Sequence, residues 1–246
     1  MFSIFKKTAP LSSDYFPIVT DIHSHILPGI DDGSPDIETS LILVEGLMKL
    51  GITQSVATPH IIGDLYRNDA ASINNALSLL RNLLAEKQID FKVTAAAEYM
   101  LDDYFLELLA LNKPLLTIKN NIVLTEFSYA DKPYNVEQLL FRIITEGYQP
   151  ILAHPERYGY YHNDFKQYDY LSEIGFLLQV NLLSLTGYYG KPASKAAHYI
   201  IKNNLHSFVG TDLHHARHLS VLSDIKNRIL FGEIFNNKKF NEQMEF

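Results

Sequence analysis

The sequence predicts a single-domain α/β protein, built as a barrel of about seven βα units. The length of 246 residues suits one barrel-type domain. Short β-branched runs alternate with longer stretches of helical period, as in repeated βα units. Nearly every predicted strand also ends in a polar or metal-binding side chain. A barrel brings all those ends together on one face, whereas an open sheet spreads them apart, so we favour a barrel.

The predicted strands are short apolar runs that cover residues 16–23, 52–60, 91–99, 121–127, 148–154, 175–181 and 205–212. Helices are predicted over 36–50, 69–88, 101–111, 135–146, 164–174, 191–204 and 219–236. In the first helix, Ile37, Leu41, Val44 and Leu47 share one face, and Gly51 follows where a C-terminal cap is wanted. No linker interrupts the pattern. Residues 1–246 therefore form one domain, with an N-terminal extension over 1–15 and a C-terminal helical tail over 219–246.

The composition excludes several classes of protein. With 47% hydrophobic residues, the chain buries a sizeable core. A net charge of -7 argues against nucleic acid or an anionic membrane as the main partner. The absence of cysteine excludes disulfides, zinc–thiolate sites and cysteine nucleophiles. The N-terminus has no apolar run long enough for a signal peptide or a membrane span, so we expect a cytoplasmic protein without membrane insertion.

The most specific motif is TDIHSHILPGIDDG, at residues 20–33. Alternate side chains of a strand share a face, so His23 and His25 can bind one ion together while Ser24 points away. Asp31 and Asp32 follow in a loop that can fold back over the mouth of the barrel. A chance His pair followed by an ordinary turn is the alternative, and the other strand ends make it unattractive.

Further metal-binding side chains end the later strands. They are Glu98, Glu126, His60 in ATPH, His154 in LAHPERYG, and Asp212 with His214 in GTDLHHARH. Because proline adjoins His60 and His154, we expect an extended backbone that presents both side chains forward. Buried carboxylates need a cation to offset their desolvation, and a carboxylate can bridge two ions. Mixed imidazole and oxygen ligands suit Mn, Fe or Zn, so we expect more than one such ion.

Arginines and tyrosines near the strand ends suggest how an anionic substrate binds. Arg157, three residues after His154, offers a planar donor set that matches phosphate oxygens, although a surface salt bridge is the alternative. We interpret His215 and His218 as outer or surface groups. Tyrosines near the predicted loops can form an aromatic rim for a phenyl ring, and the better candidates are Tyr129, Tyr158 and Tyr188.

These motifs resemble the polymerase and histidinol phosphatase superfamily, and more closely its bacterial tyrosine-protein phosphatases of capsule and exopolysaccharide synthesis. The likeness covers about residues 17 to 218, and HILPGIDDG with AHPERY makes it specific. It implies a distorted seven-stranded barrel with a trinuclear manganese or iron site. By the same likeness, one ion is held by His23, His25, Glu98 and Asp212, a second by Glu98, Glu126 and His154, and a third by Asp32, His60 and His214.

The resemblance also assigns roles outside the ligand set. Asp32 is favoured over Asp31 as the ligand, and we expect it to act in catalysis as well. Arg157 matches a phosphate-binding arginine, and Arg217 lies in a loop of variable spacing where a second one is expected. The implied substrate is a phosphotyrosine-bearing protein, such as a bacterial tyrosine kinase of polysaccharide export. The oligomeric state stays open, with a homo-oligomer as one option.

The predicted function is therefore phosphotyrosine hydrolysis by a metal-dependent phosphatase that regulates capsule or exopolysaccharide synthesis. Two or three divalent ions would lower the pKa of bound water and supply hydroxide for an in-line displacement. Without cysteine, the thiolate route to the same reaction is closed. Three alternatives remain: a sugar or histidinol phosphate phosphatase, an amidohydrolase, and a non-enzymatic, metal-stabilised regulatory subunit. Glu126 weakens the second, because amidohydrolases commonly have a carbamylated lysine at that strand end.

Overall fold

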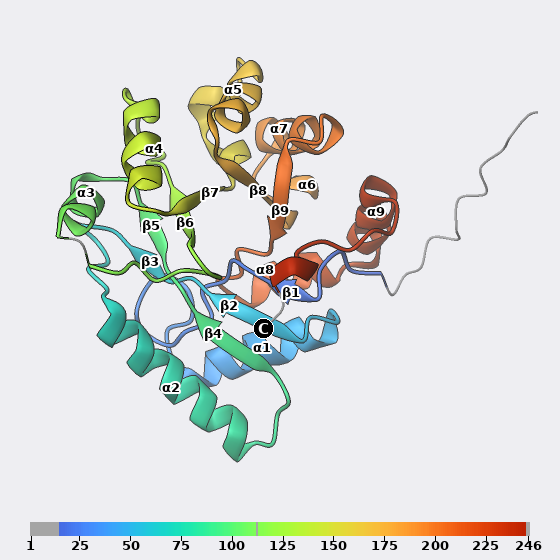
Figure 1. Cartoon of the computed structure of the whole chain (residues 1–246). Coiled ribbons are helices and arrows are strands. Elements are labelled where there is room, and N and C mark those ends of the chain that lie inside the picture. The colour runs from blue at the N-terminus through green and yellow to red at the C-terminus, as the bar shows by residue number, and fades with distance from the viewer. Residues whose placement is uncertain (1–14, 112, 245–246) are drawn as a thin grey trace, which may run out of the picture.

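The computed structural model describes residues 15–111 and 113–244 as one α/β domain (Figure 1). Its named strands pair in parallel throughout. A three-stranded sheet has the order β1 (Thr20–Asp21), β2 (Gln54–Ala57), β4 (Lys92–Ala95). A six-stranded sheet has the order β3 (His60–Ile61), β5 (Glu98–Met100), β6 (Ile122–Glu126), β7 (Gln149–Ala153), β8 (Leu177–Asn181), β9 (His206–Gly210).

The α/β class, the single domain and the parallel pairing are confirmed, but a closed barrel of seven strands is not. The described residues form nine strands in two sheets, because the predicted strands 52–60 and 91–99 each divide in two. Both divide at the same level, since Ala57 pairs with Ala95 before the break and His60 pairs with Glu98 after it. Pro59 lies at this level and has no amide hydrogen to give to a ladder, which interrupts the pairing.

The helices lie on the outside of the sheets, and most fall within the predicted segments. They are α1 (Ile37–Lys49), α2 (Ala70–Glu86), α3 (Asp103–Ala110), α4 (Val136–Thr145), α5 (Lys166–Ile174) and α7 (Lys191–Lys202). The side chains of Asp36, Asp69 and Asp102 cap the first three of these helices. Gly51 and Gly175 follow α1 and α5 with φ of 88° and 121°, a backbone that favours glycine.

The predicted helix over 219–236 is instead a pair, α8 (Ala216–Ser223) and α9 (Ile225–Phe235). They separate at Asp224, whose side chain caps the second helix. The short α6 (Leu182–Leu185) and three 3-10 turns, η1 (Pro155–Arg157), η2 (Gly159–Tyr161) and η3 (Glu242–Met244), were not predicted. No helix in the described ranges is long and apolar enough to cross a membrane.

An inner core draws on both sheets. It contains Ile22, Val56, Ala96, Leu124, Ile151 and Phe208, together with Met244 from the end of the chain. The C-terminal segment returns to the strands, since the Phe240 amide donates to Pro17 O at 2.9 Å and buried Asn241 donates to Val209 O at 2.7 Å. Of the N-terminal extension expected over 1–15, residues 1–14 lie outside the described residues.

Candidate metal centre

Glu98 lies at the middle of a cluster of imidazoles at the carboxyl ends of the strands. Its Oε2 is 3.2 Å from His23 Nε2, 3.3 Å from His25 Nε2 and 3.2 Å from His60 Nδ1. Its Oε1 is 3.0 Å from His154 Nε2. The carboxylate is fully buried. Four predicted ligands from three strand ends therefore converge on one carboxylate, because His23 and His25 follow the same strand.

Asp212 is the second buried carboxylate of the cluster, and its two oxygens have different partners. Oδ1 is 3.4 Å from His23 Nε2 and 3.4 Å from His214 Nδ1. Oδ2 accepts hydrogen bonds from Arg157 at 2.6 Å and from the Asn181 side chain, through Nδ2, at 2.7 Å. One oxygen is thus anchored by the protein, and the other faces the histidines. The Arg157 pair is partly buried, so the simple surface salt bridge considered for Arg157 does not describe it.

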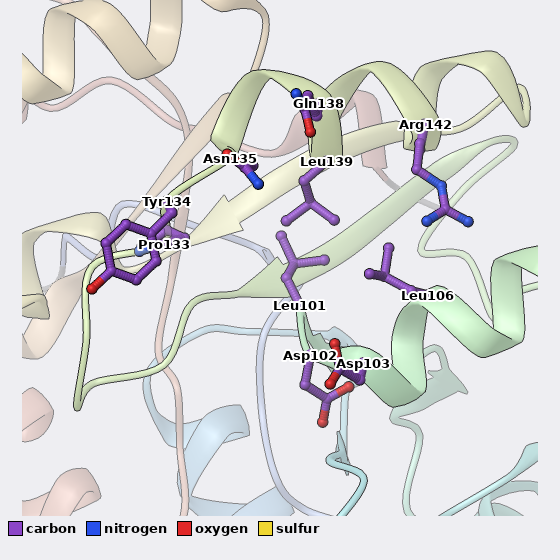
Figure 2. Close-up of a pocket in the computed structure, with 10 residues that line it drawn as sticks. All are labelled: Leu101, Asp102, Asp103, Leu106, Pro133, Tyr134, Asn135, Gln138, Leu139 and Arg142. Carbon is purple, nitrogen blue, oxygen red and sulfur yellow. The ribbon is translucent and has the colours of Figure 1, made fainter.

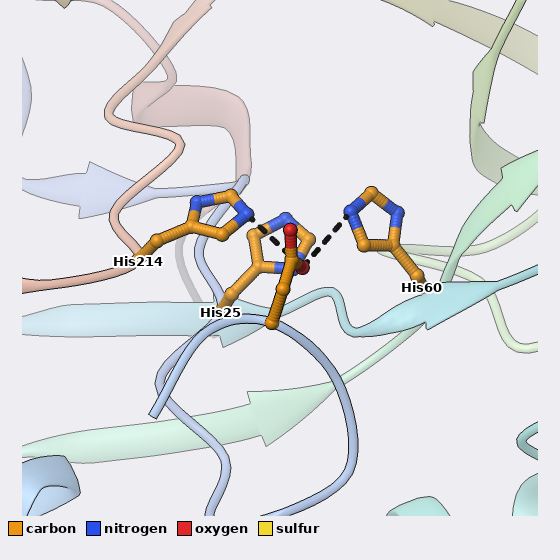
Figure 3. Close-up of side chains that lie close together, drawn as sticks. His25, His60 and His214 are labelled. Carbon is orange, nitrogen blue, oxygen red and sulfur yellow. Dashed lines mark ion pairs between the residues drawn. The ribbon is translucent and has the colours of Figure 1, made fainter. Parts of the chain in front are cut away.

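The remaining predicted ligands lie on the open side of the cluster. Glu126 Oε1 is 2.9 Å from His60 Nδ1. Asp32 Oδ1 is 3.5 Å from His60 Nε2 and 3.6 Å from His214 Nε2. Figure 3 labels these two histidines and His25 and marks the ion pairs as dashed lines. Asp31 has a different role, because its carboxylate contacts the outer nitrogen of His25, Nδ1, at 2.8 Å. Of the two adjacent aspartates, Asp32 is therefore the one that faces His60 and His214.

Outer hydrogen bonds orient the histidine rings. Gln179 Oε1 lies 2.7 Å from His23 Nδ1, and the Asp31 carboxylate holds the same atom of His25. An acceptor at Nδ1 fixes a proton there, so Nε2 is the nitrogen that would bind a metal ion. The Tyr129 hydroxyl lies 3.2 Å from His154 Nδ1. These partners were not predicted, although Gln179, two residues before Asn181, shares its face of a strand and could have been found.

The cluster fits a cation by its own chemistry. Glu98 Oε2, Glu126 Oε1 and His60 Nδ1 are buried without a hydrogen-bond partner. Burying charged oxygens without hydrogen bonds is costly, and a positive ion removes that cost. In each of four groups of residues, the possible ligand atoms lie within 4.8 Å of one another. The groups are His25–Asp32–His60–His214, His23–His154–Asp212, His23–His25–Glu98 and His60–Glu98–Glu126.

The electrostatics of the cluster favour ionised groups despite burial. Burial lowers the pKa of His23, but the Glu98 and Asp212 carboxylates outweigh it and raise that pKa to about 9. Burial raises the pKa of Glu98, but His23 and His60 outweigh it and hold that pKa well below its usual range. Protons and metal ions compete for the same nitrogens, so metal binding here releases protons.

Arg157 borders the open side between two tyrosines. Its guanidinium lies 5.1 Å from the centre of the Tyr129 ring and 4.1 Å from that of Tyr189. With Asp32 and Asp212 it lines a hollow of about 300 Å³. The Tyr129 residue is 45% exposed. An arginine held by a carboxylate and two rings thus lies beside a partly exposed tyrosine.

Other predicted rim residues differ in their placement. Tyr188 lines the same hollow, but Tyr158 is fully buried and donates to Ala153 O at 3.0 Å, so the rim expectation for Tyr158 is wrong. Arg217 is exposed, with its guanidinium 5.6 Å from the centre of the Tyr188 ring. The Tyr158 hydroxyl also accepts the Phe127 amide at 2.9 Å, so it is held between the residues that follow β6 and end β7.

The backbone at His154 was also predicted wrongly. It is left-handed, with φ 34° and ψ 52°, instead of extended. Its carbonyl accepts the Arg157 amide at 2.8 Å, which closes the η1 turn and outweighs the preference of a residue before proline. Of the two histidines expected to be outer groups, His215 is exposed, and His218 is buried with Nδ1 3.3 Å from the His214 amide.

Fold and site together define a class: an α/β domain with a cluster of histidine and carboxylate side chains that could hold metal ions and an adjacent arginine. Within that class the chain belongs to the capsular polysaccharide synthesis CpsB/CapC family, whose model matches residues 19–223.

Named relatives and a solved structure agree with this membership. The chain is 30% identical to tyrosine-protein phosphatase YwqE of Bacillus subtilis (strain 168) over 197 residues, which is 80% of this chain and 78% of the relative. It is 30% identical to the putative tyrosine-protein phosphatase CapC of Staphylococcus aureus over 229 residues, 92% and 86% of the two chains. A solved structure, described with YwqE from Bacillus subtilis and CpsB from Streptococcus pneumoniae as metal-dependent tyrosine phosphatases, matches with a TM-score of 0.78 and 29% identity over 87% of each chain.

Proposed function

We propose that this chain is a metal-dependent protein-tyrosine phosphatase that acts in capsule or exopolysaccharide synthesis. The observation that carries the proposal is the buried Glu98 carboxylate among four imidazoles, with Arg157 at the edge of the same cluster. Family membership and the names of the relatives support the substrate class.

We infer that two or three divalent ions bind, with Mn or Fe preferred and Zn compatible. Four carboxylates, Glu98, Glu126, Asp212 and Asp32, face the cluster. In the metal-free protein Arg157 and protonated histidines such as His23 offset their charge, and bound ions would replace those protons. The ligand sets are those that the resemblance implies: His23, His25, Glu98 and Asp212; Glu98, Glu126 and His154; and Asp32, His60 and His214. Mixed nitrogen and oxygen ligands support the choice of metals.

The bound ions would activate water and offset charge on the phosphoryl oxygens. Arg157 binds the phosphoryl group, and its ion pair with Asp212 fixes its position before substrate arrives. The exposed face of Tyr129 packs on the phenyl ring of phosphotyrosine. Asp32, on the open side beside His60 and His214, exchanges protons with the reacting groups. Arg217 offers a second positive charge at the rim.

We also infer that the two sheets act as one distorted barrel. The Asp212 amide donates to His23 O at 2.8 Å, and Ser24 bridges Leu213 in parallel, which links the ends of the two sheets. The shared inner core supports the same view. In this arrangement every strand end reaches one mouth, as a common centre requires.

The proposed substrate is a phosphotyrosine-bearing protein, such as a tyrosine kinase of polysaccharide export. Such a kinase is phosphorylated with cellular ATP, so we place the phosphatase in the cytoplasm.

The test is a comparison of initial rates on a phosphotyrosine peptide, a phosphoserine peptide and a sugar phosphate. The protein is stripped of metal and then given Mn, Fe, Zn or Mg. We expect metal-dependent turnover with the phosphotyrosine peptide as the best substrate. A preference for the sugar phosphate would indicate a small-molecule phosphatase, and metal binding without turnover would indicate a regulatory subunit. Either outcome contradicts the proposal.

A further inference from the structure

A second hollow, which we call the α3–α4 groove, lies outside the metal centre. It has a volume of about 440 Å³ and lies between the start of α3 and the first turns of α4. Figure 2 shows Leu101, Leu106 and Leu139 grouped between Tyr134 at one end and Arg142 at the other. The leucines are partly buried, whereas Tyr134 is 95% exposed. The groove therefore combines an apolar middle with polar and aromatic ends.

Both walls of the groove continue from strands that carry predicted metal ligands. Leu101 comes three residues after Glu98, and its amide donates to Glu126 O at 2.9 Å. Tyr134 lies in the loop after β6, the same loop that carries Tyr129 to His154. The groove thus lies on the rim where a chain leaving the metal centre would run.

In a protein substrate, the residues beside the phosphotyrosine must lie along this rim, because the metal centre itself is recessed. An extended chain advances about 3.3 Å per residue, so side chains a few residues from the phosphotyrosine reach beyond the centre. Exposed tyrosine and arginine beside a small apolar pocket are typical of residues that dominate binding at protein interfaces.

The charges of the groove indicate which side chain it selects. The oxygens of Asp102 accept the amides of Gly63 and Phe105, each at 2.9 Å, so this carboxylate already has partners. Asp103 lies in the first turn of α3, where the helix dipole favours a negative charge. Arg142 is exposed and has no ion pair within residues 15–111 and 113–244. An incoming carboxylate would therefore meet Arg142 and be repelled from the Asp103 wall.

We propose that the α3–α4 groove docks the segment that flanks the phosphotyrosine of a protein substrate. An apolar side chain enters between the leucines, and an acidic side chain pairs with Arg142. This inference rests on the proposed phosphatase function and adds to it the sequence preference of the substrate. Tyr134 and Arg142 act in binding the substrate chain and take no part in the chemistry.

The experiment uses the metal-loaded full chain and a panel of short phosphotyrosine peptides. A leucine–glutamate pair is moved stepwise along either side of the phosphotyrosine, and the reference peptide has serine at both positions. We expect the wild type to show a lower KM than for the reference peptide when the leucine–glutamate pair stands at one or two of these positions. Tyr134→Ala and Arg142→Ala should raise that KM roughly five- to tenfold. Their rates on para-nitrophenyl phosphate, which has no flanking chain, should not change.

Two further variants make the test specific. Phe141→Ala removes a side chain that is 71% exposed on the same helix but does not line the groove, and it should leave every KM unchanged. Asp103→Asn should leave the KM of the acidic peptide unchanged or lower it. A lower KM for a peptide with lysine in place of the glutamate, lost in Asp103→Asn, would mean that the groove selects a basic side chain, which would overturn the charge assignment.

The outcomes separate this inference from the proposed function. If no aryl phosphate is hydrolysed with any metal, the phosphatase assignment fails. If hydrolysis occurs but the peptide panel gives one KM, or Tyr134→Ala and Arg142→Ala match Phe141→Ala, the docking inference alone fails. A change of oligomeric state in Tyr134→Ala, measured by sedimentation velocity, would assign the groove to a second copy of the chain and would likewise overturn it.

Discussion

Replacing Glu98 with glutamine tests the metal centre most directly. The change keeps the shape of the side chain and removes a negative charge that lies within 3.3 Å of four imidazole nitrogens. Two unit charges at about 4 Å attract by roughly 4 kcal/mol at an effective dielectric of 20, and a divalent ion is attracted more strongly. We therefore expect metal affinity to fall by at least about 100-fold, which corresponds to about 2.7 kcal/mol.

Metals per chain are measured by elemental analysis, together with aryl phosphate hydrolysis and far-UV circular dichroism. We expect Glu98→Gln to lose both metal and turnover and to keep its secondary structure. Glu156→Gln is the matched control, because Glu156 is equally buried but its Oε1 accepts Ser184 and the Asn181 amide and does not face the histidines. It should retain its metal.

A folded Glu98→Gln protein with near wild-type metal content and rate would refute the reasoning. Glutamine accepts and donates hydrogen bonds, so it would satisfy a purely structural position at the strand end. Equal metal loss in Glu98→Gln and Glu156→Gln would also count against it, because the effect would then belong to any buried glutamate near the mouth.

Four further predictions concern the same site. Chelation should abolish activity and Mn or Fe should restore it better than Mg, so activity in protein shown by elemental analysis to be metal-free would contradict the assignment. Arg157→Ala should lower kcat/KM by roughly 30- to 150-fold, or about 2–3 kcal/mol, and exposed Arg217→Ala by less; equal losses would be contrary evidence. Tyr129→Ala should reduce kcat/KM for aryl phosphates about tenfold more than for alkyl phosphates, whereas Tyr129→Phe should keep the ring and the preference for aryl phosphates. Equal losses on both substrates would show that Tyr129 does not contact the phenyl ring. Because the pKa of His23 is raised to about 9 in the metal-free protein, the ring is protonated below that pH, and metal affinity by chelator competition should rise as the pH approaches 9; a flat profile would argue against His23 as a ligand.

The sequence predicted which side chains would meet because two simple rules were enough. Parallel βα units bring strand ends to one edge, and alternate residues of a strand share a face. Glu126 ends β6 and His154 follows β7, as the first rule predicts. His23 and His25 face the same centre although both follow β1, and Glu98, expected at a strand end, is the first residue of β5. The number of strands was harder to predict, because an interruption of the ladder at Pro59 leaves the hydrophobic pattern unchanged.

The residues that the sequence did not reveal depend on side-chain contacts between distant segments. Gln179 reaches His23 across 156 positions of sequence. The strand alternation places Gln179 on the same face as Asn181, but it does not indicate that His23 is its partner. Tyr158 follows a strand in an irregular turn, where no periodicity says which way a side chain points. Burial there is decided by the hydrogen bonds that Tyr158 makes to Ala153 and Phe127.

The backbone at two of the strand ends shows how the fold directs side chains into the centre. His154 and Asp212 both have positive φ, 34° and 51°, where a non-glycine residue costs on the order of 1 kcal/mol or more. Such a conformation persists only when neighbouring hydrogen bonds hold it. The His154 carbonyl accepts the Arg157 amide at 2.8 Å, and the Asp212 amide donates to His23 O at 2.8 Å. The bonds that hold these two strained residues therefore also place Arg157 and His23, so the arginine and the first histidine are positioned by the same turns that present the ligands.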